Sequence, residues 1–184
     1  MSSIKGNKTI IFFDGDGTIW YPKSTKRSKP PYWIYGDTKN KKISSHYLRH
    51  LVLTNTALKT LKKLRRQNIR LVLLSTHPHT PKIADVVLHM KLKHLKILDI
   101  FDEYCATNGS PGAKGRKIAT LLKKYKLSKS RALMVGDSYH YDYLSAKSVG
   151  VDGLLLRSTY LKHPARGPKV TKMINKISDI LKFI

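Results

Sequence analysis

The chain has 184 residues, of which 41% are apolar, and it carries a formal net charge of +25 at neutral pH. This length suits one α/β domain with a sizeable core, and the apolar fraction excludes a largely disordered chain. No apolar run approaches the roughly 18 residues of a membrane-spanning helix, so we expect no membrane association.

Apolar runs and amphipathic segments alternate along the chain. Four short apolar runs are expected to form buried parallel strands: 9–13, 69–74, 132–135 and 153–156. Apolar residues at helical spacing predict three helices: 54–67, 114–125 and 142–149. The alternation predicts an α/β fold with a doubly wound, mostly parallel, Rossmann-like sheet, whose active site lies at the carboxyl ends of the strands.

The segment 21–45 interrupts this alternation with prolines, lysines and a short aromatic strand candidate at 32–35. We expect it to form a small flap or hairpin beside the site, and we expect no large cap domain. Residues 173–184 are expected to close the fold as a short strand and a helix. The chain 1–184 is therefore predicted to form a single domain with one insertion.

The first predicted strand runs directly into two carboxylates in the stretch IIFFDGDGTIW. Asp14 and Asp16 are like charges at close range, which destabilise each other unless a cation or a proton intervenes. A segment that accepts this cost is more often a functional site than a packing solution. Thr18, in the same DGDGT motif, is a candidate supporting residue.

Further polar residues follow the other predicted strands. LVLLST ends on Ser75 and Thr76, which are candidate phosphate-binding residues. ALMVGDSYHYD contains Asp137 and Asp142, and Lys114 of PGAKG lies 23 positions before Asp137. Because the carboxyl ends of parallel strands meet in one crevice, we expect these side chains to share a small volume with the two carboxylates of the first motif.

This set of residues matches the needs of phosphoryl transfer. A carboxylate nucleophile approaches a dianionic phosphate only if cations neutralise the charge. Mg²⁺ prefers oxygen ligands and would bind Asp14 and Asp137, together with the main-chain carbonyl of Asp16 and waters. Lys114 would supply a fixed positive charge, and Ser75 a neutral hydrogen-bond donor, for the phosphoryl oxygens.

Asp16 is the candidate acid and base that exchanges a proton with the leaving oxygen. Neighbouring negative charge is expected to raise its pKa and to help it hold the proton that it donates.

Four motifs stand in the order DGDGT, LVLLS, the lysine of PGAKG, and GDSYHYD. They resemble the motifs of the haloacid dehalogenase (HAD) superfamily of aspartyl-nucleophile phosphatases, over roughly residues 9–157. The resemblance implies that Asp14 is the nucleophile and Asp16 the acid and base. The implied activity is a Mg²⁺-dependent phosphomonoesterase that acts through an aspartyl-phosphate.

The same resemblance implies roles for the later motifs. Ser75 and Lys114 would bind the phosphate, and Asp137 would be the second magnesium carboxylate. Asp142 would act through water or by holding Lys114.

The chain looks most like a small, nearly capless, magnesium-dependent branch of that superfamily. Trp20 follows the first motif, and the stretch from PGAKG to GDS is short, as in that branch. Only 61 positions separate Asp14 from Ser75, and 39 separate Ser75 from Lys114, so neither gap can hold a core unit and a large cap. Gly15 differs from the residue of that branch and would remove a side chain near the metal.

Other interpretations of the acidic motif fit less well. An EF-hand calcium loop needs a glycine at its sixth position and an acid at its twelfth, where this chain has Ile19 and Thr25. A receiver domain also pairs acids at strand ends but lacks the DGDGT order. His77, His79 and His140 lie close to the motifs, where they are substrate contacts or ordinary loop residues.

The basic charge leaves the substrate class open. The chain has thirty-six Lys and Arg residues but only eleven Asp and Glu residues. Either compositional bias or attraction to a polyanion explains this excess of positive charge. Three functions remain: a phosphatase for small esters, a phosphatase for phosphorylated nucleic-acid ends, and a basic nucleic-acid-binding protein on the same fold. The one cysteine, Cys105, cannot form an internal disulfide, which favours a reducing, cytoplasmic location.

Overall fold

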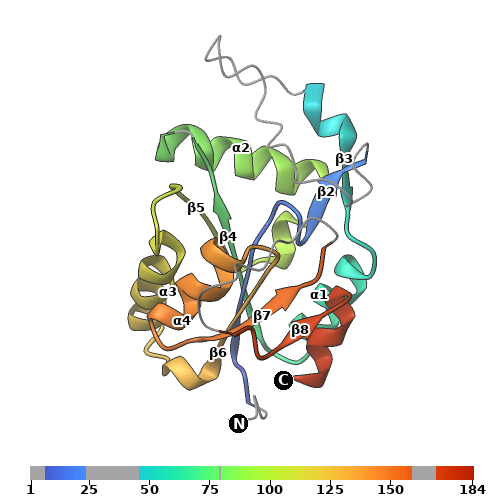
Figure 1. Cartoon of the computed structure of the whole chain (residues 1–184). Helices are drawn as coiled ribbons and strands as arrows, with labels where there is room; N and C mark the ends of the chain where they lie inside the picture. Colours follow the sequence, from blue (N-terminus) through green and yellow to red (C-terminus); the bar gives the residue numbers. More distant parts are fainter. Residues whose placement is uncertain (1–6, 24–45, 79, 159–168) are drawn as a thin grey trace.

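A six-stranded parallel sheet forms the centre of the computed structural model, which describes residues 7–23, 46–78, 80–158 and 169–184. Its strands lie in the order β5-β4-β1-β6-β7-β8 (Figure 1). Their bounds are β1 Ile10–Phe13, β4 Arg70–Thr76, β5 Glu103–Thr107, β6 Ala132–Gly136, β7 Asp152–Leu156 and β8 Met173–Ile174. All neighbouring strands are parallel, so their carboxyl ends lie along one edge of the sheet.

The register of the central strands determines which residues meet at that edge. Phe13 of β1 lies opposite Leu73 of β4 on one side and Val135 of β6 on the other. The carboxyl ends of all three strands therefore lie next to one another. Asp14 and Asp137 directly follow β1 and β6, and Ser75 and Thr76 are the last residues of β4.

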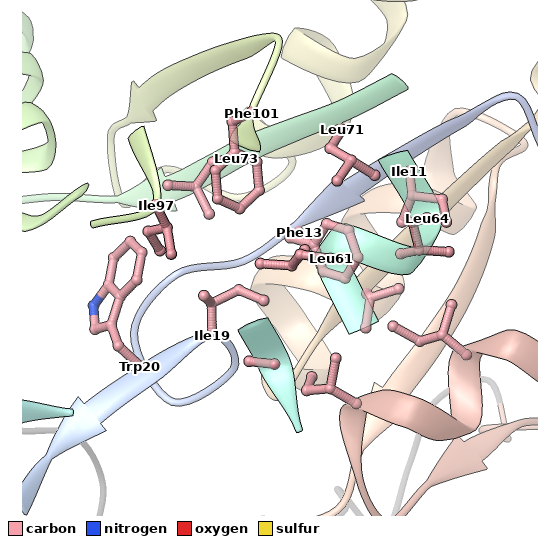
Figure 2. Close-up of a cluster of buried hydrophobic side chains, with 14 of the residues drawn as sticks. Ile11, Phe13, Ile19, Trp20, Leu61, Leu64, Leu71, Leu73, Ile97 and Phe101 are labelled. Atoms are coloured by element: carbon pink, nitrogen blue, oxygen red, sulfur yellow. The ribbon is translucent and has the colours of Figure 1, made fainter. Parts of the chain in front are cut away.

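Helices cover both faces of the sheet. Helices α1 (Ala57–Arg66) and α2 (Pro81–His94) and the 3₁₀ helix η6 (Ile177–Lys182) pack on one face, and α3 (Ala113–Lys124) and α4 (Ser145–Ser148) pack on the other. Figure 2 shows the first of these two cores, where Ile11 and Phe13 meet Leu61 and Leu64 of α1. Ile10 and Phe12 point into the second core, because successive side chains of a strand alternate between its faces. The predicted doubly wound α/β fold is confirmed.

Shorter elements connect these layers. An antiparallel pair of strands, β2 (Trp20–Pro22) and β3 (Leu51–Leu53), lies beyond the first motif. The remaining short helices are η2 His46–His50, η3 Leu98–Ile100, η4 Lys129–Arg131 and the π-helix η5 Tyr139–Leu144. Within the described ranges there is no large cap domain, as predicted. None of the described helices has the length and apolar character needed to cross a membrane.

The structure also contains elements that the sequence pattern did not predict. Helix α2 and strand β5 lie between the second and third motifs, where no element was expected. The predicted helix 142–149 begins earlier, as the π-helix η5, and continues as the short α4. The predicted final strand and helix are present as β8 and η6. Most of the predicted flap, including the strand candidate 32–35, lies outside the described residues.

Candidate active site

The turn after β1 carries the two carboxylates of the first motif. Asp14 and Asp16 are both buried, with 6% and 4% of their surface exposed. The hydroxyl of Thr18, which is also buried, donates to Oδ2 of Asp14 at 3.1 Å. Gly15 lies between the carboxylates because a Cβ there would approach the ring of Trp20 to 2.5 Å. Close packing against Trp20 thus explains this glycine better than space near a metal does.

Lys114, in the first turn of α3, joins two carboxylates from separate segments. Its Nζ lies 2.5 Å from Oδ1 of Asp14 and 2.6 Å from Oδ1 of Asp142. All three side chains are buried. A Cβ at Gly136 would lie 2.1 Å from Oδ2 of Asp142, so the glycine that ends β6 permits this approach. Asp142 was expected to act through water or by holding Lys114, and the structure contains the direct contact with Lys114.

Three buried carboxylates form a group with the geometry of a cation site. Asp14, Asp137 and Asp142 each offer one oxygen, and these oxygens lie within 4.8 Å of one another. Burial raises the pKa of Asp14 well above its ordinary value, and the charges of Asp142 and Asp137 act in the same direction against Lys114. A hard cation such as Mg²⁺ prefers oxygen ligands and would relieve this repulsion, so the residues fit such an ion.

Asp16 has a partner that the sequence analysis did not identify. Nζ of Lys91 lies 2.9 Å from both carboxylate oxygens of Asp16, and the lysine is fully buried. Burial alone would raise the pKa of Asp16, but the charge and hydrogen bonds of Lys91, together with the charge of His77, place this pKa below its ordinary value. The expected upward shift was therefore wrong, because the dominant neighbour of Asp16 is a cation.

The spacing of the buried residues in α2 could have identified Lys91 from the sequence. The buried residues of α2 are Ala84, Val87, Leu88, Lys91 and Leu92, which form one stripe at helical spacing. A lysine in such a stripe is rarely fully buried unless it is paired, and its partner must come from another element.

The two hydroxyls at the end of β4 lie in different surroundings. Oγ of Ser75 lies 3.4 Å from Oδ2 of Asp16, and the side chain is buried. Oγ1 of Thr76 lies 3.4 Å from Oγ1 of Thr107 on the edge strand β5. Ser75 thus joins the carboxylate cluster, whereas Thr76 faces the neighbouring strand. Phosphate binding by either hydroxyl stays a prediction.

The three candidate histidines also differ in position. His77 is buried beside the site, and its charge acts on Asp16. His140 is exposed on η5, and His79 lies outside the described residues.

Residues 16–156 match the family model of haloacid dehalogenase-like hydrolases. The chain belongs to this family. The match spans the second aspartate of the first motif, both later carboxylates and Lys114, so it includes most of the cluster described above. No curated protein matches this sequence significantly.

Solved structures share this fold at low sequence identity. A HAD phosphatase from Thermococcus onnurineus superimposes with a TM-score of 0.68 at 18% identity, over 95% of this chain and 96% of that one. A predicted phosphoglycolate phosphatase from Haemophilus somnus gives 0.67 at 19% identity, over 96% and 98%. YfnB from Bacillus subtilis, solved bound to magnesium, gives 0.66 at 12% identity, over 96% and 98%.

Proposed function

We propose that this protein is a Mg²⁺-dependent phosphomonoesterase that acts through an aspartyl-phosphate on Asp14. The observation that carries the proposal is the position of Asp14, whose carboxylate lies 2.5 Å from the buried Lys114 and within the carboxylate group of Asp137 and Asp142. A nucleophilic carboxylate that must meet a dianion needs fixed positive charge beside it. Membership in a hydrolase family and structural likeness to a HAD phosphatase support the same reaction class.

The charge balance of the buried cluster supports a divalent cofactor. The four buried carboxylates are those of Asp14, Asp16, Asp137 and Asp142, and the two buried ammonium groups are those of Lys91 and Lys114. The carboxylates outnumber the ammonium groups by two, so a net negative charge remains even when the buried His77 is charged, and buried charges in proteins are paired or coordinate metals. Asp14 and Asp137 would hold Mg²⁺, which when bound supplies charge neutralisation to the transferring phosphoryl group.

The reaction would proceed in two displacements. A carboxylate oxygen of Asp14 would form a bond to phosphorus while the bond to the leaving oxygen breaks. Asp16 would give that oxygen a proton, which it must take up before this step because Lys91 favours its ionised form. Water then attacks the aspartyl-phosphate, Asp16 takes the proton of the water, and inorganic phosphate leaves as Asp14 is restored. Ser75 and Lys114 would hold the phosphoryl oxygens through both steps.

The test measures phosphate release from p-nitrophenyl phosphate with Mg²⁺ and with EDTA. Full activity in EDTA would contradict metal dependence. Asp14→Asn should lower kcat by more than about a thousandfold, because the amide is a poor nucleophile. Asp99→Asn, which removes a charge from an exposed residue of η3, is the matched control and should keep full activity. An active Asp14→Asn protein would require another nucleophile.

Phosphorylated nucleic-acid ends are the second candidate substrate. The observation that favours them is the outer face of α1, where five cationic residues are exposed: Lys59, Lys62, Lys63, Arg65 and Arg66. Such a face, in a chain of net charge +25, would attract polyanions and lose them as salt rises. Comparing 3′- and 5′-phosphorylated oligonucleotides with small phosphate esters over a salt series distinguishes the two substrate classes. Salt-sensitive binding without hydrolysis would instead support a pure nucleic-acid-binding protein. A cytoplasmic location is compatible with a phosphatase for small esters, with a phosphatase for nucleic-acid ends and with a binding protein.

A further inference from the structure

A polar pocket lies at the amino edge of the sheet, opposite the candidate active site. Its volume is about 370 Å³, within the range of pockets that bind small ligands. Its lining includes Thr9, just before β1, Arg70, the first residue of β4, and Tyr125, just after α3. This edge, where β1 begins, lies at the foot of Figure 1. Five positions of β4, or about 17 Å, separate Arg70 from Ser75, so the pocket is distinct from the acidic cluster.

Arg70 forms a stack with an aromatic ring inside this pocket. Its guanidinium carbon lies over the ring of Tyr125, 4.0 Å from the ring centre, in a cation–π arrangement. The side chain is half-buried, and none of the ion pairs between described residues includes it. Unpaired bases stack on arginine planes as well as on aromatic rings. The stack is therefore a suitable platform for a nucleic-acid base.

Arg65, at the end of α1, is the second arginine of the pocket. Its Nη1 lies 2.5 Å from Oδ1 of Asp102, whose Oδ2 accepts a hydrogen bond from the main-chain N–H of Leu71 at 2.8 Å. Both oxygens of this carboxylate are thus engaged, while the exposed guanidinium of Arg65 keeps further N–H donors. The described lining holds two arginines and one carboxylate, so it favours an anion.

The outer face of α1 carries positive charge up to this pocket. Four exposed cationic residues lie on one side of the helix over about 10 Å: Lys59, Lys62, Lys63 and Arg66. Helix α1 contains no acidic residue, and like charges four positions apart destabilise a helix. The helix dipole favours cations only in the last turn, so it does not explain Lys59 and Lys62. A bound polyanion would offset this repulsion.

We propose that the amino-edge pocket and the outer face of α1 bind single-stranded nucleic acid, with one base on Arg70 and a backbone phosphate on Arg65. A single strand fits better than a duplex, because the bases of a duplex are stacked on one another and cannot enter a pocket. The surface is separate from the active site. The inference therefore holds whether the strand is a substrate of the proposed phosphatase or only a partner.

The experiment measures binding by fluorescence anisotropy with a labelled strand of about sixteen nucleotides, the upper site size of common single-strand-binding domains. The strand carries no terminal phosphate monoester, so it offers the active site no ester. Wild type should bind the strand at least about threefold more tightly than the duplex with its complement. Attraction by charge alone would favour the duplex, whose charge density is higher. Equal or tighter binding of the duplex would overturn the proposal.

Two variants separate base stacking from phosphate contact. Arg70→Lys keeps the charge but loses the planar group, so it should weaken binding of the strand about fivefold or more with an unchanged salt dependence. Arg65→Gln should make the slope of log affinity against log salt shallower by about 0.7, the value for one lost phosphate contact of a single strand. Arg49→Gln, at an exposed position of η2, is the matched control and should change neither quantity.

Full affinity in Arg70→Lys would overturn the base platform, and an unchanged slope in Arg65→Gln would overturn the phosphate contact. Displacement of the strand by adenosine monophosphate at concentrations near the Kd of the strand would instead indicate a site for free nucleotides. If Arg65→Gln does not fold, Lys62→Gln on the same face is judged by the same slope. Turnover of p-nitrophenyl phosphate by wild type is measured separately, so failure of the proposed function and failure of this binding site are distinguishable.

Discussion

The ammonium group of Lys91 lies at the same distance, 2.9 Å, from the two carboxylate oxygens of Asp16. Lys114 contacts one oxygen of Asp14 as well as Asp142, so each aspartate of the first motif contacts a different buried lysine. The two lysines come from helices on opposite faces of the sheet, α2 and α3. Each of these two neighbouring carboxylates thus has a cation beside it, which reduces the repulsion between them.

Mg²⁺ should stabilise the folded protein through the carboxylate group. An ion present at about 100 times its dissociation constant adds about 2.7 kcal/mol, which is several degrees in melting temperature. Asp137→Asn should raise the melting temperature without metal, because it removes a charge that opposes Asp14, and should reduce the rise caused by Mg²⁺. Thermal shift with and without Mg²⁺ measures both effects. An undiminished Mg²⁺ response in Asp137→Asn would contradict the ligand assignment, and Asp99→Asn is the control.

Gly15→Ala should destabilise the motif loop. The added Cβ would lie 2.5 Å from a ring carbon of Trp20 and 3.2 Å from Oγ of Ser75, and such overpacking costs about 1–3 kcal/mol. Urea unfolding measures the loss. Gly109→Ala is the matched control, because a Cβ there meets nothing within 4 Å. Trp20→Phe replaces the indole by a smaller ring, so Gly15→Ala should reduce the free energy of unfolding by less in that background. An unchanged loss would show that the clash is not with Trp20.

The ion pair of Lys8 and Asp152 should make stability depend on pH. Nζ of Lys8 lies 2.7 Å from Oδ2 of Asp152, and although burial opposes it, this contact lowers the pKa of Asp152 below its ordinary value. A lowered folded-state pKa stabilises the protein above the unfolded value of about 4, and this stability is lost as pH falls through the folded value. Asp152→Asn should therefore cost about 1 kcal/mol at pH 7 and progressively less below pH 4.

Urea unfolding of wild type and Asp152→Asn at a series of pH values from 7 to 3 measures this difference. If the difference in unfolding free energy between the two proteins stays constant over this pH range, the charge of Asp152 does not stabilise the fold.

Cys105 should react slowly with thiol reagents in the folded protein. The thiol is buried on β5, and burial raises its pKa to about 11. Only about one thiol in a thousand would be ionised at pH 8, and the thiolate is the reactive form. Absorbance with Ellman's reagent should rise slowly in buffer and rapidly in denaturant. Rapid reaction in buffer would indicate that β5 opens readily at this edge of the sheet.

The sequence by itself determined most of the sheet and most of the acidic site. Apolar runs such as Ile10–Phe13 that alternate with helical segments indicate a parallel sheet covered by helices on both faces, and the polar ends of the strands then meet at one edge. That rule, applied to local patterns alone, placed Asp14, Ser75 and Asp137 together with Lys114. The structure brings these residues to that edge.

Only the tertiary structure decided the environment of Asp16. Its pKa depends on which cation lies nearest, and Lys91 is 75 positions away on a helix that was not predicted. Helix α2 was missed because a lysine occupies its apolar stripe, and that lysine is tolerated only because the motif loop supplies a carboxylate. Local periodicity reports which side chains are apolar, whereas the partner of a buried charge is set by how distant elements pack.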